Sequence, residues 1–435
     1  MKNYRLIVPV TMVILMVISW YMLISDAIET DLLYKTYLTE ARTKAKDGIT
    51  KYAIEYYNLA LDIKNTPEIN AEVAEYYKSQ GMNNEYLSWS ENFFETYPTN
   101  AKAYDCILEA YLAEQDYEEC YDILEIAQKR SINSDYIEKV KKDIQYAYKL
   151  DYSSFDDVGI FINGFCSVKE GDFWGFVDVY GTQQISSIYK QVSGFSENNI
   201  VAVVDKNNEA YFIDSIGDKI KVSKEKYLSF GMENGNIFTA KNNDNKYIYV
   251  DKDFNKLFGE YDYASTMNEG IAAVKNGKDW HLINDKGKKV SDSSYLDVKL
   301  NENNEACVNN RLFVSSSKGK YIMIDKSGKR IGNLEFDDAK VFSSDAPAAV
   351  KIKGHWLFID SKGKLISKKY YDDARSFSNG LAAVCINGKW GFVDIHENLV
   401  IDTQYFGSKD FNNKGSCFVQ TGDKWQLLKL YRLNR

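Results

Sequence analysis

The fold of this chain is decided by one stretch, Gly388-Lys389-Trp390-Gly391-Phe392-Val393-Asp394. Its Trp-x-Phe-x-Asp core, complete or degenerate, starts at Trp174, Ala210, Tyr247, Trp280, Tyr321, Trp356, Trp390 and Trp425. Successive starts lie 36, 37, 33, 41, 35, 34 and 35 residues apart. Self-similarity at such a period predicts a stacked array of one small unit. A residue that recurs in every unit serves packing first, so the repeat also argues against an enzyme.

Each unit is predicted to hold three short strands joined by turns. A strand such as 380–384 (GLAAV) leads through a turn into the Trp strand, and a third brief strand follows. Alternation at period two puts Trp390 and Phe392 on one face and Gly391 on the other. The Trp strand ends in a turn such as 360–363 (DSKG), whose Asp accepts from backbone N–H groups two residues on. The pattern predicts an all-β array of about eight units over residues 151–435.

This pattern closely resembles that of the WG-repeat family, which is named for its Trp-Gly pair. The complete pair stands at Trp174 and Trp390, whereas Tyr247, Tyr321 and Ala210 replace the Trp in three other units. The resemblance implies a bacterial protein with an all-β repeat array, and it brings no shared catalytic residues. Two architectures fit: a ring of propeller type, which protects its sheet edges, and an open β-solenoid, whose ends need caps. We expect the ring, which requires the first and last units to share a sheet.

Residues 28–150 lack alternation and carry apolar residues at helical spacing. The stretch 53–61 (AIEYYNLAL) resembles the second helix of a tetratricopeptide repeat, with Ala53 and Ala60 seven residues apart on one face. A shift of 33 residues carries Gly48 onto Gly81, each at a turn between paired helices. The resemblance covers about three repeats, residues 34–134, and we expect a capping helix from Ser134 to Lys149.

The tetratricopeptide resemblance also implies a place for a ligand, because the concave groove of that family binds peptide segments. It makes Lys102, Asp105 and Glu109 candidate binding residues. One alternative interpretation is that these three residues form a solvated helix face. Another is that the helices serve as a spacer that holds the next domain away from a membrane.

The N-terminal segment predicts a membrane anchor. Leu6 to Ser25 is a run of 20 residues without a charge, enough for a helix that spans a bilayer core. Two basic residues precede the run and three acidic residues follow it: Lys2, Arg5, Asp26, Glu29 and Asp31. The positive-inside rule places the N-terminus in the cytoplasm and the rest of this single-pass protein outside the cell membrane. The alternative is a signal peptide cleaved near 25–27 (SDA). The sequence therefore predicts three domains, which comprise residues 1–27, 28–150 and 151–435.

Charge and cysteine content exclude several classes of protein. The net charge is −8, with 24 acidic and 14 basic residues in 26–150 and 38 of each in 151–435. Nucleic-acid binding requires clustered Lys and Arg, so we expect no nucleic-acid partner. None of the 6 Cys forms a C-x-x-C pair, so we interpret them as small buried hydrophobic residues rather than a disulfide framework.

No motif predicts catalysis, a metal or a cofactor. Adjacent carboxylates at 156–157, 337–338 and 372–373 point to opposite strand faces, so no pair flanks a glycosidic bond. The stretch 243–245 (NDN) resembles a calcium ligand set but fits a hairpin turn better. His281, His355 and His396 lie in different units without a nucleophile partner in any recognised motif. We therefore expect a non-enzymatic protein with no cofactor.

The leading functional hypothesis is an extracytoplasmic interaction scaffold that binds protein or peptide partners, because both repeat types build large concave surfaces. The alternative is a cell-wall or polysaccharide-binding module, which the 33 Tyr and the expected location favour. A glycan hydrolase is a distant third. Most Trp side chains fall on the core face of the repeat. We expect partial exposure only for Trp89 and for Tyr pairs such as 76–77 and 370–371.

Overall fold

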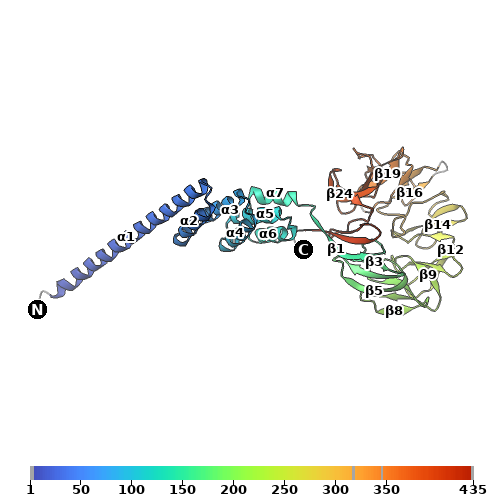
Figure 1. Ribbon diagram of the computed structural model, residues 1–435. Coiled ribbons are helices and arrows are strands. Elements are labelled where there is room, and N and C mark those ends of the chain that lie inside the picture. The colour runs from blue at the N-terminus through green and yellow to red at the C-terminus, as the bar shows by residue number, and fades with distance from the viewer. Residues whose placement is uncertain (1–3, 316–318, 344–345, 433–435) are drawn as a thin grey trace. The chain divides into compact units, whose positions relative to one another are not determined.

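The computed structural model describes residues 4–315, 319–343 and 346–432, with side chains from residue 12 onward. It contains two compact units. The helical unit comprises residues 1–147 and 431–435, and the β-repeat unit comprises residues 148–430. Helices followed by many strands are the order that the sequence predicts (Figure 1).

Helix α1 (Tyr4–Lys46) contains the apolar N-terminal segment. Its side chains between Met12 and Ile24 are exposed, including Trp20 at 72% and Tyr21 at 75%. Among the described residues, α1 is the one helix long and apolar enough to cross a membrane. The same properties suit a signal sequence, so both interpretations of this segment remain compatible with the structure.

Six shorter helices follow α1: α2 (Thr50–Ile63), α3 (Pro67–Ser79), α4 (Asn83–Thr96), α5 (Ala101–Ala113), α6 (Tyr117–Lys129) and α7 (Asp135–Asp143). Side chains cap several N-termini; the Ser134 hydroxyl, for example, accepts from the backbone N–H of Ile137 at 3.0 Å. Gly48 and Gly81 lie at the predicted turns with φ of +72° and +68°, a conformation that glycine adopts without strain.

The expected capping helix is shorter than the sequence suggested. It begins after its Ser134 cap but ends at Asp143, and Tyr148 already lies in strand β1 (Tyr148–Phe155). The reason is pairing: residues 148–150 align with residues 428–430 of the last strand. A backbone ladder thus overrides the helical spacing at this boundary.

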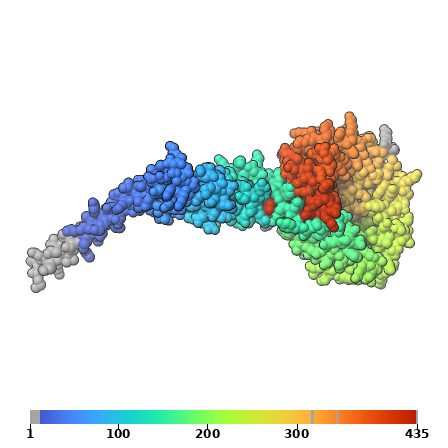
Figure 2. Space-filling model, viewed as in Figure 1, coloured from blue at the N-terminus to red at the C-terminus, as the bar shows by residue number. Residues whose placement is uncertain are grey.

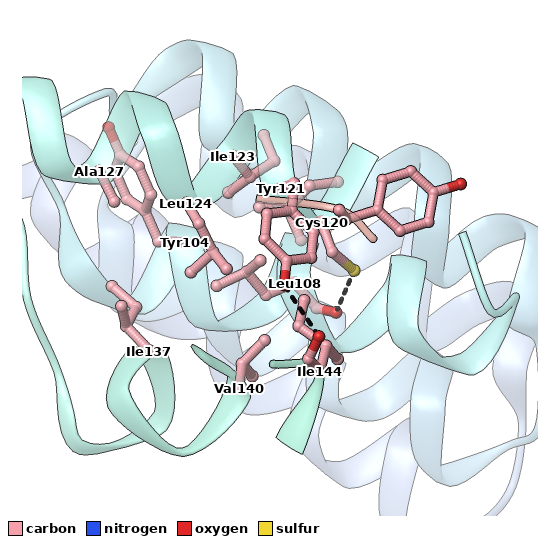
Figure 3. Close-up of a cluster of buried hydrophobic side chains, with 12 residues drawn as sticks. Tyr104, Leu108, Cys120, Tyr121, Ile123, Leu124, Ala127, Ile137, Val140 and Ile144 are labelled. Atoms are coloured by element: carbon pink, nitrogen blue, oxygen red, sulfur yellow. Dashed lines mark hydrogen bonds between the residues drawn. The ribbon is translucent and has the colours of Figure 1, made fainter. Parts of the chain in front are cut away.

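The helical unit has its own core. Figure 3 shows the cluster in which Leu108, Leu124, Ile137 and Val140 pack together from α5, α6 and α7. Tyr431 joins this cluster, where its ring stacks on that of Tyr121 at 5.6 Å between centroids. The C-terminal part of the described chain is therefore a packing element of the helical unit.

The described part of the β-repeat unit forms seven antiparallel sheets. One sheet holds β2 (Asp157–Val158), β3 (Phe165–Glu170), β4 (Phe173–Asp178), β5 (Gln183–Val192), β6 (Val201–Asp205), β7 (Ala210–Ile213) and β8 (Lys219–Val222). The next two hold β9 (Tyr227–Phe230), β10 (Phe238–Asn242), β11 (Tyr247–Val250) and β12 (Lys256–Tyr261), then β13 (Tyr263–Ala264), β14 (Ile271–Asn276) and β15 (Asp279–Asn284).

The remaining four sheets complete the array. They hold β16 (Leu312–Ser315) and β17 (Tyr321–Ile324); β18 (Asp338–Ala339), β19 (Ala348–Ile352) and β20 (His355–Ile359); β21 (Asp373–Ala374), β22 (Leu381–Ile386), β23 (Lys389–Asp394) and β24 (Leu399–Tyr405); and β1 with β25 (Gly407–Ser408), β26 (Ser416–Gln420) and β27 (Trp425–Leu430). The turn chemistry is as predicted: Asp360 Oδ1 accepts from the N–H groups of Lys362 and Lys364, both at 2.9 Å.

The glycine of the Trp-Gly pair leaves room for a bulge in the third strand. Trp390 pairs with Tyr405 and Phe392 with Ile401, so four residues of β24 oppose two of β23. A Cβ on Gly391 would lie 2.5 Å from the carbonyl oxygen of Ile401, far inside van der Waals contact. In unit six Leu357 takes the position of Gly391, and the third strand makes only isolated bridges at Tyr371 and Leu365. The glycine thus leaves space for this four-against-two bulge, which recurs where Trp174 pairs with Tyr189 and Phe176 with Ile185.

The first and last strands of the β-repeat unit share one sheet. Strand β1 pairs antiparallel with β27, with Leu150 opposite Leu428. Figure 2 shows the red C-terminal repeat against the green first repeat. Lys429 Nζ lies 3.0 Å from Asp151 Oδ2 and supports the same pairing.

Candidate functional site

The candidate functional site is a cavity of about 950 Å³ in the β-repeat unit. Its walls come from short segments of six repeats: 160–164, 268, 300–308, 340–343, 375–379 and 410–414. Residues separated by about 250 positions in the sequence therefore line one space. A site of this kind depends on the whole array rather than on any single repeat.

Hydrogen bonds between neighbouring repeats hold the walls in place. Asn268 Nδ2 donates to the carbonyl oxygen of Cys307 at 2.9 Å, and Asn379 Nδ2 donates to that of Phe411 at 2.7 Å. Ser378 Oγ donates to the same Phe411 oxygen at 2.9 Å. These donors lie at the hairpin turn that opens each repeat, so one turn type fixes successive wall segments.

One wall segment is an insertion in the fifth repeat. The residues that pair across the inner hairpin are ten positions apart at Ala264 and Val274, at Val158 and Val168 and at Ala374 and Val384. In the fifth repeat Val298 pairs with Val314, sixteen positions away. The extra residues form the insertion loop, residues 299–306, and explain the 41-residue spacing between two Trp-strand starts.

The insertion loop is anchored through its backbone and its asparagines. Asn301 Oδ1 accepts from the N–H groups of Asn303 and Glu305 at 3.0 and 2.9 Å. The N–H of Thr266, in the fourth repeat, donates to the carbonyl oxygen of Asn304 at 2.7 Å. Asn304 Nδ2 donates to the carbonyl oxygen of Ala264 at 3.1 Å. None of these bonds uses the side chain of Glu302 at the tip.

Four charged side chains from three repeats meet at the tip of this loop, and we name them the cavity clamp: Glu302, Arg375, Lys409 and Asp410. Arg375 Nε and Nη2 donate to the two carboxylate oxygens of Asp410 at 2.6 and 3.0 Å. Arg375 Nη1 lies 2.7 Å from Glu302 Oε1, and Lys409 Nζ lies 2.7 Å from Glu302 Oε2. One guanidinium therefore holds two carboxylates from different repeats.

The clamp favours the charged forms of Glu302 and Arg375. Burial favours the neutral acid of Glu302, but the charges of Arg375 and Lys409 outweigh it and lower the pKa of this carboxyl. Burial likewise opposes the charge of Arg375, and Asp410 and Glu302 overcome it and raise the pKa of the guanidinium. Neighbouring Glu305 differs: burial raises its pKa, and Asn301 Nδ2 donates to its carboxylate at 2.8 Å.

Two lysines outside the clamp, Lys340 and Lys414, also line the cavity. Lys340 Nζ lies 3.9 Å from Asp373 Oδ1 and 4.9 Å from the ring centroid of Trp356. Lys414 is exposed and forms no salt bridge with a described residue. Three basic side chains, Lys340, Arg375 and Lys414, thus line the cavity beside the three carboxyl groups of Glu302, Glu305 and Asp410.

The three binding residues predicted from sequence lie elsewhere, on α5 of the helical unit. Glu109 is engaged internally, with Lys78 Nζ 2.8 Å from Oε1 and the Tyr86 hydroxyl donating to Oε2 at 3.0 Å. Asp105 Oδ1 accepts from the Ser134 hydroxyl at 2.5 Å, and Lys102 is exposed. These contacts join α5 to neighbouring helices, so two of the three side chains already serve the helical unit itself.

The paired carboxylates and the NDN stretch have structural partners. Asp156 Oδ2 accepts from the N–H of Gly171 at 2.8 Å, and its other oxygen pairs with Lys424. Asp157 Oδ1 accepts from the next backbone N–H, that of Val158. The NDN stretch is a hairpin turn between β10 and β11, as expected. Among the described residues, no group of three or more His, Cys, Asp and Glu side chains has a metal-binding arrangement.

The aromatic residues divide differently from the expectation. Tyr76 and Tyr77 are buried, because their rings pack between helices. Of the second pair, Tyr371 is buried and Tyr370 is 70% exposed. Trp89 is half-buried as expected, and its Nε1 donates to the carbonyl oxygen of Asn70.

Four of the five repeat Trp side chains have a lysine ammonium near the ring, and the fifth, Trp390, lies opposite Cys385. Trp280 and Trp356 are buried, and Trp174, Trp390 and Trp425 are half-buried. The ammonium of the cross-strand lysine lies 5.9 Å from the ring centroid of Trp174 and 5.8 Å from that of Trp280. A covered ring of this kind offers no free face for a sugar.

These observations define the class of protein: a β-repeat protein with a cavity lined by six repeats, joined to a helical unit. The chain carries the WG containing repeat, whose family model matches residues 249–280, 358–390 and 390–425. This confirms the resemblance on which the repeat analysis rested. No curated protein sequence matches the chain.

Two solved structures illustrate the similarity at the level of the backbone. BamB from Moraxella catarrhalis aligns with 65% of this chain over all of its own length, at 10% identity and a TM-score of 0.44. The β-propeller domain of Cps50 (Swd1) from Myceliophteria thermophila aligns over the same shares, at 9% identity and a TM-score of 0.35.

Proposed function

We propose that this chain is a membrane-anchored, non-enzymatic interaction scaffold whose β-repeat unit binds a protein or peptide partner in the cavity. The observation that carries the proposal is the construction of the cavity. Wall segments from six repeats present amides and paired charges on hydrogen-bonded turns. A preorganised polar surface of this size suits an extended peptide segment.

The proposal includes closure of the β-repeat unit into a ring of propeller type. Its support is the pairing of β1 with β27 and the presence of the first and eighth repeats in the same cavity wall. Closure leaves the cavity as the place where six of the eight repeats converge. The helical unit is proposed to be tetratricopeptide-like, which its paired helices and glycine turns support.

Membrane anchorage is proposed through α1. Lys2 and Arg5 precede the apolar segment and acidic residues follow it, so the positive-inside rule places both units outside the cytoplasm. The absence of a catalytic role is likewise a proposal. It is supported by the clamp, whose four charges are satisfied by one another rather than poised against an open position.

Site-specific photo-crosslinking tests the proposed function. Asn413 is exposed and lines the cavity, so a photo-reactive residue placed there in the full chain, in its native cells, samples the site. The matched control is Asn207, which is exposed in the β6–β7 turn and does not line this cavity. We expect a discrete protein adduct from position 413 that position 207 does not give. Equal labelling from both positions would contradict the proposal.

A cell-wall glycan is the second candidate, because exposed rings occur on the β-repeat unit outside the cavity. Tyr180, Tyr370 and Phe406 are 59%, 70% and 56% exposed. Co-sedimentation of the full chain with isolated cell walls, competed by free glycan, tests this candidate. Substituting Tyr370 with Ala should weaken saturable binding if these rings stack on sugars. Binding that Tyr370→Ala leaves unchanged would remove the support that this ring gives to the candidate.

A further inference from the structure

The cavity clamp has the construction of a carboxylate-binding site. A guanidinium held by a bidentate carboxylate is fixed in orientation, and Asp410 holds Arg375 in this way. The remaining Nη1 and the ammonium of Lys409 converge on one carboxylate from two sides, at 2.7 Å each. Glu302 occupies this position.

The Glu302 side chain can leave its position without disturbing the loop that carries it. The insertion loop is anchored by Asn301, Asn304 and backbone groups, so rotation of the Glu302 side chain breaks none of the anchoring bonds. The clamp side chains are also accessible from the cavity: 31% of the Glu302 side chain and 20% of the Arg375 side chain are exposed. An incoming group can therefore reach Arg375 from the cavity without unfolding a repeat, and at the position of Glu302 it meets Lys409, whose side chain is 16% exposed.

Replacing the Glu302 carboxylate by a carboxylate of a ligand avoids the electrostatic cost of leaving partly buried cations without a partner. Removing Glu302 alone would leave Lys409 without its carboxylate and Arg375 with Asp410 as its one remaining partner in the clamp, which is unfavourable in a partly buried site. A second carboxylate that takes its place keeps both cations paired. Lys414 is exposed in the same lining and forms no salt bridge with a described residue, so a further acidic group on the same ligand would be attracted to it.

The residues that line the cavity also favour an acidic peptide over a sugar as the ligand. The described wall of the cavity contains no Trp or Tyr. Of its three Phe residues, Phe342 and Phe411 are 0% and 3% exposed, and Phe161 is half-buried with its ring stacked on that of Phe418. Sugar sites commonly use open ring faces, which this wall does not offer.

We propose, building on the proposed function, that the cavity binds an acidic peptide segment, whose Asp or Glu carboxylate displaces Glu302 from between Arg375 and Lys409. Glu302 is then a resident competitor, and the insertion in the fifth repeat is the device that supplies it. The partner is a protein with an exposed run of acidic residues.

Fluorescence anisotropy with the full chain in detergent micelles tests this inference. The probes are a labelled peptide rich in Glu and a matched peptide with Gln in place of each Glu. Wild type should bind the Glu peptide and not the Gln peptide. Glu302→Gln should bind the Glu peptide about tenfold more tightly, because a neutral amide competes less well for the two cations. Glu260→Gln, which removes a paired but distant carboxylate, should leave the affinity unchanged.

Two further variants keep the test decisive. Arg375→Gln should lower the affinity at least tenfold, and Lys414→Gln, an exposed change that leaves the clamp intact, should lower it by a smaller factor. Equal affinity for the two peptides, or an affinity unaffected by Glu302→Gln and Lys414→Gln, would overturn the inference. Competition by inorganic phosphate as effective as that by the Glu peptide would also overturn it, since the site would then be a general anion site.

The outcomes separate this inference from the proposed function. A protein adduct at position 413 together with no preference for the Glu peptide would leave the scaffold in place and refute the acidic partner. No adduct and no peptide binding would refute both. Cell-wall binding that survives Arg375→Gln, with no peptide binding, would also refute the acidic-peptide site.

Discussion

Replacing Gly391 by Ala should destabilise the β-repeat unit, because the added Cβ has no space. It would lie 2.5 Å from the carbonyl oxygen of Ile401, 2.8 Å from the carbonyl carbon of Asp402 and 2.8 Å from the backbone nitrogen of Thr403. All three atoms belong to the backbone of the bulge in β24, so no side-chain rotation relieves the contact. We therefore expect a cost at the upper end of the overpacking range, about 3 kcal/mol.

The magnitude translates into measurable quantities. At about 2–4 °C per kcal/mol for a unit of this size, Tm should fall by roughly 6–12 °C. Hydrogen exchange should locate the damage, with faster exchange in β24 (Leu399–Tyr405) than in β22, which pairs with the other edge of β23. Differential scanning calorimetry and exchange mass spectrometry on the full chain in micelles provide both measurements.

The matched control is His281→Ala, at the same repeat position in a unit that already carries a Cβ there. His281 is half-buried and touches only Ser293 and Lys289 through its ring, so its loss should change stability by less than about 0.5 kcal/mol. If Gly391→Ala melts with wild type and β24 retains its protection, the steric account of the Trp-Gly pair is wrong.

Three other predictions concern the clamp, the helical core and the anchor. Glu302→Gln should lower the free energy of unfolding by about 1–2 kcal/mol at pH 7. Because the pKa of Glu302 lies below its ordinary 4.5, this difference from wild type should persist above pH 4.5 and shrink as the pH falls further. A difference that grows on acidification would contradict the clamp. Tyr431→Ala should lower the free energy of unfolding by about 3 kcal/mol and speed hydrogen exchange in α6 and α7. The control Tyr152→Ala, which removes a fully exposed ring, should change neither quantity. Unchanged hydrogen exchange in Tyr431→Ala would refute the packing of Tyr431. Deleting residues 1–27 should leave the protein in the supernatant after ultracentrifugation, and sedimentation with membranes would show a second membrane-binding element.

Local chemistry made the repeat predictable. The strand of Trp390, the turn of Asp360 and the glycine turns at Gly48 and Gly81 all follow from residue type and spacing, because each is specified within a few residues. The early end of the last helix does not follow from local sequence, because β1 forms only when its distant partner strand is present. Propensity at residues 144–149 carries no information about that partner.

The candidate site was missed for a related reason. Glu302, Arg375 and Lys409 lie in three repeats, and nothing in their local sequence distinguishes them from other surface charges. One signal was available: the 41-residue spacing in the fifth unit marks an insertion, and insertions in repeat arrays map to loops. The helical candidates were chosen by position on a helix face, which does not reveal that Glu109 already pairs with Lys78.

The pairing of β1 with β27 has a consequence for how the protein is made. The strand of Leu150 has no β27 partner until Leu428, which lies 278 residues further along the chain, has been synthesised. At about 5–20 residues per second, synthesis keeps that strand edge open for roughly 15–55 s. An unfinished or clipped chain retains the open edge at the beginning of its first repeat. Damage at one end of the array is thus displayed at the other, where a protease or a holdase that recognises unpaired strands can distinguish a complete copy from a defective one.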